Sequence, residues 1–286
     1  MSEERKTETD GSPEAVDRQS PRFASTDEDI IVFRSTDGTL FNIHSCNLRC
    51  TTDGPLAENF TAVPGEKVQL TEDAKTLDML FGFVYPSLHP SLVNIPFPTF
   101  AAVAEAAEKY HVAPARTVCR IIIRVSELYK EHPLEILEFA FRHGHHDLLD
   151  HAAPYSLRVE MRKARQTLSL PLFAAWVDYR QAFNDAFWCS DIRFRDCHEG
   201  SGDPCPFWPE VVFAVDKTLE KQRGHSPLYA DLDALFKAGK VRSVQCNVKG
   251  STSGTGCSEQ LLAWRESFIR ETSSVLPLSR IFACTN

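Results

Sequence analysis

The clearest pattern of apolar and polar positions lies near the start of the chain. Ile30 to Phe33 is a short apolar run rich in β-branched residues, which predicts a buried strand. Asp37-Gly38 follows, and this pair favours a hairpin turn because both of its positions accept positive φ. The returning segment, Thr39 to Ile43, alternates so that Phe41 and Ile43 share one face. We therefore expect a two-stranded hairpin whose register is fixed by its apolar face.

Helical patterns follow the hairpin. Leu48 to Phe60 predicts two short helical pieces separated by Asp53-Gly54-Pro55. A short strand is expected at Val68 to Leu70, and apolar residues at helical spacing then run from Leu77 to Val84. Two more amphipathic helices are expected after Thr99 and Pro114. The second is predicted to turn these apolar residues toward the core: Val118, Ile121, Ile122, Val125, Leu128 and Tyr129.

The rest of the chain predicts a mostly helical region. Residues 131–188 form an expected helical extension, in which a long helix from Pro171 carries a core stripe. Residues 189–286 form an expected C-terminal helical region with loops rich in Cys, Gly and Pro. The stripe consists of Leu172, Trp176, Tyr179, Phe183 and Phe187. The predicted fold class is α+β, a small N-terminal sheet flanked by a helical cluster and followed by this helical region.

The order of these signals resembles the BTB/POZ domain, and most closely its fungal type. The signals are an Asp29-Ile30-Ile31 strand start, the hairpin, Phe41-x-x-His44 at a helix start, a helix ending at Phe60, a Val68-x-Leu70 strand, and Leu77-x-x-Leu80-Phe81-x-Phe83-Val84-Tyr85 followed by Pro86. The resemblance covers residues 26–125 well and the next helices loosely. It implies a BTB/POZ domain over residues 27–130, with a three-stranded sheet and an outer surface that docks other proteins.

The resemblance also implies where interaction residues lie, namely Asp29, His44 and Phe60. Many BTB domains have a basic residue after the histidine, facing the strand aspartate across a pocket. Ser45 holds that position here. By its chemistry alone, His44 is interpreted as a structural hydrogen-bonding residue, because no orienting partner stands near it at triad or metal spacing.

The implied function is a protein–protein interaction module, an adaptor or scaffold that docks other proteins or forms a homodimer. A substrate adaptor of a cullin-based ubiquitin ligase is the alternative. The hydrophobic-x-Glu element of cullin-binding members is not found at its usual spacing, and Val63 to Glu66 is the nearest match. The segment before Asp27 also lacks the apolar strand of exchanged-strand dimers.

Charge and composition exclude several classes of function and location. Residues 1–28 hold eight acidic and four basic residues, with Phe23 as their one aromatic, so residues 1–26 predict a disordered acidic tail. The net charge of −8 over 286 residues argues against nonspecific nucleic-acid binding. No apolar run approaches the ~20 residues of a membrane span. With a charged, polar N-terminus, we expect an intracellular protein of the cytoplasm or nucleus.

Nine cysteines without regular spacing predict reduced thiols. One constellation suits zinc: Cys189, Cys197, His198 and Cys205, with Cys246 or Cys257 as a further ligand. The gaps between the first three cysteines are seven residues each, longer than the close pairs of structural zinc sites. We therefore expect no metal, no cofactor and no catalytic set, hence no enzyme. A zinc-stabilised structural protein and a thiol enzyme using this loop are the alternatives.

Overall fold

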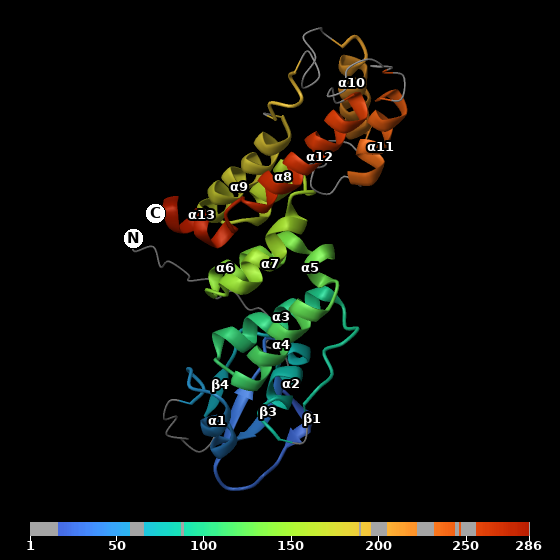
Figure 1. Cartoon of the computed structure of the whole chain (residues 1–286). Helices are drawn as coiled ribbons and strands as arrows, with labels where there is room; N and C mark the ends of the chain where they lie inside the picture. The colour runs from blue at the N-terminus through green and yellow to red at the C-terminus, as the bar shows by residue number, and fades with distance from the viewer. Residues whose placement is uncertain are drawn as a thin grey trace, which may run out of the picture. The chain divides into compact units, whose positions relative to one another are not determined.

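The computed structural model describes residues 17–57, 66–86, 89–188, 190–195, 205–221, 232–243, 246 and 256–285. The chain divides into two compact units, residues 1–125 and 126–286, each described here by itself. Figure 1 shows the strands and helices α1 to α4 in the blue-to-green part of the chain, and helices α5 to α13 in the remainder. The predicted α+β class, a sheet with helices followed by a mostly helical region, is confirmed.

The N-terminal unit is built on a mixed four-stranded sheet with the order β1-β3-β2-β4. Its strands are β1 (Arg18–Ala24), β2 (Ile30–Arg34), β3 (Thr39–His44) and β4 (Lys67–Gln69). Strands β2 and β3 form the predicted antiparallel hairpin, in which Ile31 lies opposite Ile43 and Phe33 lies opposite Phe41. Gly38 has a φ of 81° in the connecting turn, a value that glycine adopts without strain.

Strand β1 contradicts the expectation of a disordered tail reaching residue 26. It pairs in parallel with β3, so the sheet has four strands rather than three. Phe23 is only 3% exposed, and its ring centroid lies 6.0 Å from that of Phe41 and 6.1 Å from that of Phe81. The composition conceals this strand because only Ser20 and Phe23 of its seven residues are buried. Residues 1–16 lie outside the described part of the chain.

Within the described part of this unit, four helices accompany the sheet: α1 (Ser45–Thr51), α2 (Ala74–Gly82), α3 (Phe97–Lys109) and α4 (Ala113–Val125). Helix α2 begins after Asp73, whose Oδ1 accepts a hydrogen bond from the Thr76 amide at 2.8 Å. The helix packs on the sheet through Phe81, whose ring centroid lies 5.2 Å from that of Phe33 and 5.5 Å from that of Phe41. The apolar pattern predicted for this segment is therefore confirmed.

The core face predicted for the helix after Pro114 is wrong. Helix α4 buries Ala115, Cys119 and Ile123, spaced four residues apart, and it ends at Val125. Ile121 and Val125 are 54% and 75% exposed. Helix α4 packs against the alanine-rich helix α3, and small side chains at such a contact let two helices approach closely. Ile121 and Val125 consequently lie on another face of the helix.

Glu72 connects three parts of the N-terminal unit. Its carboxylate lies 2.8 Å from Lys109 Nζ and accepts a hydrogen bond from the Tyr110 hydroxyl at 2.6 Å, while its carbonyl accepts one from the Thr36 amide. Burial by itself raises the pKa of Glu72, but hydrogen bonds from Lys109, Tyr110 and Thr71 outweigh burial and lower the pKa below its ordinary value.

This lowered pKa predicts an acid-sensitive contribution to stability. The ionised Glu72 stabilises the fold above the unfolded-state pKa of about 4.3, and that stability is lost as the pH falls through the lower folded-state pKa. We expect the wild type to lose more stability than Glu72→Gln between about pH 5 and pH 3. Denaturant titrations followed by circular dichroism measure this, with exposed Glu28→Gln as the control. Parallel pH profiles for the wild type and Glu72→Gln would contradict the assignment.

The regular elements among the described residues of the C-terminal unit are all helices. Its helices are α5 (Leu128–Glu131), α6 (Pro133–Arg142), α7 (His146–Ser156), α8 (Met161–Thr167), α9 (Leu170–Trp188), α10 (Trp208–Lys221), α11 (Leu232–Ser243), α12 (Cys257–Ser273) and α13 (Leu278–Thr285). The stripe predicted for α9 is buried at all five positions and is confirmed. Among the described residues, no helix combines the length and the apolar character that crossing a membrane requires.

Helix α13 returns to the start of the unit. Asp150 of α7 accepts hydrogen bonds from the Ser279 amide at 2.9 Å and from the Ser279 hydroxyl at 2.7 Å. The rings of Phe282 and Phe141 meet edge to face with centroids 4.8 Å apart. The two regions expected at residues 131–188 and 189–286 therefore lie within a single compact unit.

Helices α9 to α12 enclose a hydrophobic cluster, which we call the C-terminal core. Its residues come from segments far apart in the sequence, and their large aromatic rings are fully or almost fully buried. They are Ala186, Phe187, Cys205, Trp208, Val211, Val215, Leu219, Leu235, Phe236, Cys257, Leu261, Trp264 and Phe268. The core thus depends on α10, α11 and α12 folding together with the end of α9.

Candidate functional site

Two of the predicted interaction residues lie at the same end of the β2–β3 hairpin. Asp29 immediately precedes β2, and His44 is the last residue of β3. The strand register pairs His44 with Ile30, and the Ser45 amide donates to the Asp29 carbonyl at 3.0 Å. The third predicted residue, Phe60, lies outside the described residues. We call the side chains gathered here the hairpin-end site: Asp27, Asp29, His44, Ser45, Arg49 and Tyr85.

His44 is held by hydrogen bonds on both sides of its ring. Its Nδ1 lies 2.8 Å from the Tyr85 hydroxyl, and its Nε2 lies 3.2 Å from Asp27 Oδ2. The same hydroxyl accepts a hydrogen bond from the His44 amide at 3.2 Å. A neutral ring protonated at Nε2 satisfies all three contacts, because Tyr85 then donates to Nδ1. The structure therefore supplies the orienting partners that the sequence around His44 does not.

Asp29 has a basic partner after all. The Ser45 hydroxyl donates to Asp29 Oδ1 at 2.5 Å, and Arg49 Nη2 lies 2.6 Å from the Ser45 hydroxyl and 3.6 Å from Asp29 Oδ1. Arg49 stands one helical turn after Ser45, so it reaches the same face of α1. The resemblance implies a basic residue at the position after His44, which Ser45 occupies here. The basic partner of Asp29 is instead Arg49, one helical turn after Ser45.

The backbone and the pKa values of this site fit an ordered, exposed surface. Asp29 has a φ of 72°, a left-handed conformation that aspartate tolerates better than most residues. A hydrogen bond from Ser25, and next one from His44, lower the pKa of Asp27, which keeps it ionised. Burial raises the pKa of Tyr85, so its hydroxyl stays protonated and able to donate.

The exposed charges of the hairpin-end site add little to the stability of the fold. The side chains of Asp29 and Arg49 are 56% and 62% exposed. An ion pair at such exposure contributes about 0–1 kcal/mol. The site therefore presents two carboxylates, Asp27 and Asp29, and one guanidinium group, Arg49, to solvent at the strand–helix junction, an arrangement suited to docking a polar surface.

Sequence reasoning missed Arg49, Tyr85 and Asp27. The four-residue spacing from Ser45 to Arg49 was a usable signal once a helix start at Ser45 was assumed. No local signal existed for Tyr85, which lies 41 residues from His44 in the chain. Of the segment nearest to a cullin-binding element, Val63 to Gly65 lie outside the described residues and only Glu66 lies within them.

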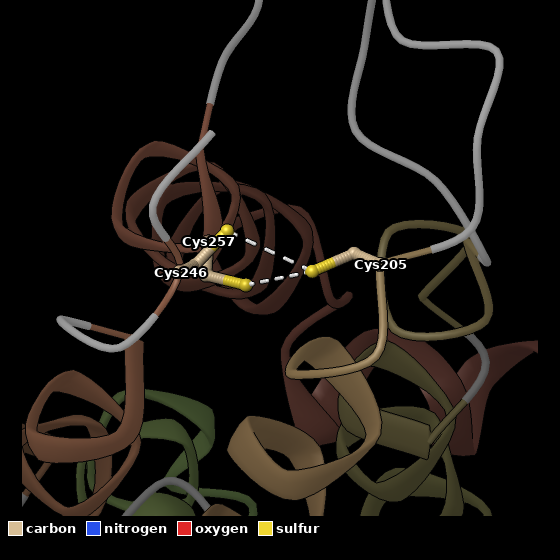
Figure 2. A group of neighbouring side chains, drawn as sticks. All are labelled: Cys205, Cys246 and Cys257. Carbon is tan, nitrogen blue, oxygen red and sulfur yellow. Dashed lines mark hydrogen bonds between the residues drawn. The ribbon is translucent and has the colours of Figure 1, made fainter. Parts of the chain in front are cut away.

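The second group of candidate residues is the cysteine set. Cys189, Cys197 and His198 lie outside the described residues. Cys205 is described, and it lies with both Cys246 and Cys257 rather than with one of them: its Sγ is 3.7 Å from Cys246 Sγ and 3.5 Å from Cys257 Sγ. Figure 2 shows the three sulfur atoms pointing toward one another. We call this group the thiol cluster.

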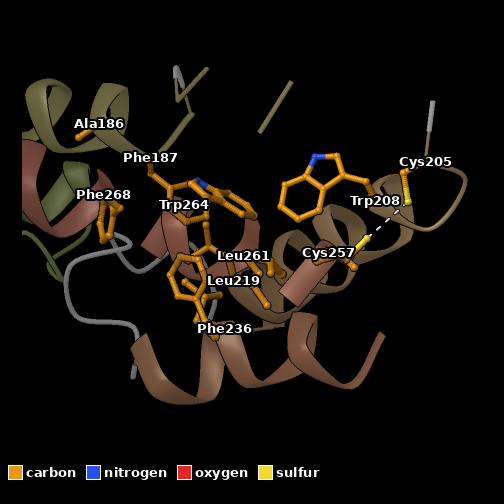
Figure 3. Close-up of a cluster of buried hydrophobic side chains, with 13 residues drawn as sticks. Ala186, Phe187, Cys205, Trp208, Leu219, Phe236, Cys257, Leu261, Trp264 and Phe268 are labelled. Carbon is orange, nitrogen blue, oxygen red and sulfur yellow. Dashed lines mark hydrogen bonds between the residues drawn. The ribbon is translucent and has the colours of Figure 1, made fainter. Parts of the chain in front are cut away.

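The thiol cluster lies at the edge of the C-terminal core. Cys205 and Cys257 are 7% and 0% exposed, and Figure 3 shows both beside Trp208. Burial raises the pKa of the Cys257 thiol, and hydrogen bonds with Cys205 and Cys246 raise it further. The seven cysteines in the described residues form no disulfide.

Two comparisons with known proteins identify neither a family nor a relative for this chain. No protein-family model matches the chain, and a search of curated proteins found no match. We therefore infer function from the hairpin-end site, the thiol cluster and the resemblance visible in the sequence.

Proposed function

We propose that this protein is a non-enzymatic adaptor whose N-terminal unit docks other proteins, with the hairpin-end site as part of the docking surface. Partners include a second copy of the chain. The observation that carries the proposal is the exposed Asp29–Ser45–Arg49 group, held in place at the junction of β3 and α1.

The element order supports the proposal. The hairpin β2–β3 leads directly into α1, and β4 then precedes α2, α3 and α4. Apart from the added strand β1, this order agrees with the one that the BTB/POZ resemblance implies for the described residues, and the helix expected to end at Phe60 lies outside them. Domains of that family bind proteins, so the resemblance assigns the same class of activity to this unit.

The rigidity of the hairpin-end site also supports the proposal. His44 is fixed by Tyr85 and Asp27, and Asp29 is fixed by Ser45 and Arg49, so the charged groups need little ordering when a partner binds. Groups held in their bound geometry lose less conformational entropy on association, which favours affinity.

Arg49→Glu tests this assignment in the full-length chain. The substitution places two carboxylates where an ion pair stood, so we expect at least a tenfold loss of affinity for partners captured by the wild type. The tagged wild type and variant are purified from the protein's own cells and compared by quantitative mass spectrometry. Sedimentation velocity of both proteins measures self-association. Recovery of a cullin among the lost partners would identify the ligase-adaptor role.

A matched control lies in the other unit. Arg265 pairs with Asp233 at 2.9 Å and is also partly exposed, so Arg265→Glu makes the same change of charge away from the hairpin-end site. We expect Arg265→Glu to keep the partners. The proposal fails if Arg49→Glu retains every partner and sediments as the wild type does, or if both variants lose the same partners. Thermal unfolding of Arg49→Glu should remain within a few degrees of the wild type, since about 1 kcal/mol or less is at stake.

A further inference from the structure

The thiol cluster has the spacing of a metal–thiolate site. All three sulfur atoms lie within 4.8 Å of one another, and two of the separations are 3.5 Å and 3.7 Å. Zinc–sulfur bonds are about 2.3 Å long, so two sulfurs on a tetrahedral zinc ion are about 3.8 Å apart. A disulfide brings two sulfurs to about 2.05 Å, which is much shorter than either separation.

The three cysteines reach this point from separate segments. Cys205 lies just before α10, Cys246 lies between α11 and α12, and Cys257 is the first residue of α12. Cys205 is separated from Cys246 by 41 positions and from Cys257 by 52 positions. Chance proximity of local neighbours therefore does not explain the cluster, because it forms only when α10 and α12 are already placed.

The surroundings also suit a bound cation. The adjacent C-terminal core excludes water from one side of the cluster. The three thiols, two buried and one half-buried, gain little from one another, since S–H groups are weak donors and sulfur is a weak acceptor.

We propose that Cys205, Cys246 and Cys257 bind one zinc ion as thiolates, and that this ion fastens the starts of α10 and α12 to the segment after α11. On binding, each S–H bond is exchanged for a Zn–S bond and the proton passes to solvent. No oxidation or reduction takes place. A water molecule or a further ligand completes the tetrahedron.

This assignment differs from the expectation of no metal that the sequence supports. Sequence reasoning looks for two cysteines separated by two to four residues, and no pair in the thiol cluster has that spacing. Soft thiolate ligands also accept copper(I) and iron–sulfur clusters. We choose zinc because it prefers tetrahedral thiolate sites and needs no redox partner.

Metal analysis of the full-length protein, purified without chelators, tests the proposal. We expect about one zinc per chain in the wild type and at least a tenfold lower content in each of Cys205→Ser, Cys246→Ser and Cys257→Ser. Cys284→Ser is the matched control, because Cys284 is an exposed cysteine of the same unit. That variant should keep its zinc.

A second measurement covers variants that fail to fold. The wild type is stripped with a chelator and titrated with Co²⁺, whose thiolate charge-transfer and tetrahedral d–d absorption report the ligand set directly. We expect both signals, and we expect added Zn²⁺ to abolish them. Because Trp208 lies beside Cys205 and Cys257 (Figure 3), removal of zinc should also shift the tryptophan emission to the red.

Several outcomes would overturn the proposal. One is a wild type with less than about a tenth of a zinc per chain and no tetrahedral cobalt spectrum. Another is zinc that survives all three serine substitutions. Stoichiometric iron or copper in place of zinc, or a disulfide between two of the three cysteines found by mass spectrometry, would also exclude it.

Discussion

Phe23→Ala is expected to destabilise the N-terminal unit by about 3–5 kcal/mol, the usual cost of removing a buried phenylalanine. Phe23 is 3% exposed, and its ring meets those of Phe41, Phe81 and Tyr85 at centroid distances of 6.0, 6.1 and 5.7 Å. Alanine leaves a cavity between the sheet and α2 that these rigid rings fill poorly. A disordered tail would predict almost no effect, so the result separates the two interpretations.

The stability of Phe23→Ala must be measured with a probe that reports on the N-terminal unit. All four tryptophans, at positions 176, 188, 208 and 264, belong to the C-terminal unit, so tryptophan fluorescence does not report on β1. Hydrogen exchange at the amides of β2 and β3 reports on the stability of the sheet that contains β1. A loss of 3 kcal/mol corresponds to about a hundredfold faster exchange through global opening.

Ile121→Ala serves as the control for Phe23→Ala. It also truncates a large apolar side chain of the same unit, but that side chain is 54% exposed. We expect a change within about 0.5 kcal/mol. Unchanged exchange rates in Phe23→Ala would show that β1 does not contribute to the stability of the sheet.

Trp264→Ala is expected to destabilise the C-terminal unit by a similar amount, about 3–5 kcal/mol. Trp264 is fully buried in the middle of the C-terminal core, with ring centroids 5.4 Å from Phe187, 5.4 Å from Phe236 and 6.3 Å from Trp208 (Figure 3). These neighbours belong to α9, α11 and α10. One substitution therefore weakens the packing of α12 against three other helices.

Trp264→Phe should cost roughly half as much or less. It keeps an aromatic ring in the core and removes Trp264 Nε1, a buried donor with no hydrogen-bond partner among the described residues. Urea unfolding followed by the emission of the remaining tryptophans gives both values. Trp188→Ala, at a 40% exposed position, is the control. Equal losses in Trp264→Ala and Trp188→Ala would contradict the packing argument.

Much of the fold was predictable because local signals and tertiary packing agree. The Asp37-Gly38 turn, the alternation around Phe41 and the stripe of α9 all appear in the structure as expected. Strand β1 was missed because a single buried aromatic anchors it within a charged segment. The face of α4 was misassigned because its sequence offers two sets of residues at helical spacing, and the buried set is Ala115, Cys119 and Ile123 rather than the more apolar one.

The candidate sites were less accessible to sequence reasoning. His44 and Asp29 were found through the order of family-like signals, but the partner of each depends on contacts across the chain, such as that between His44 and Tyr85. The thiol cluster had weaker signals still. Cys246 and Cys257 were each considered as a further ligand, yet only the packing of α10 to α12 shows that both lie beside Cys205.

The parallel pairing of β1 with β3 bears on how shorter fragments of this protein should be cut. A fragment starting at Asp27, where the family resemblance places the domain boundary, would lack Phe23 and leave the backbone of β3 open along one side. Unpaired strand edges next to exposed aromatic rings recruit other chains and promote aggregation. A fragment that aggregates from Asp27 but is well behaved from Asp17 would therefore report a missing strand, not native self-assembly.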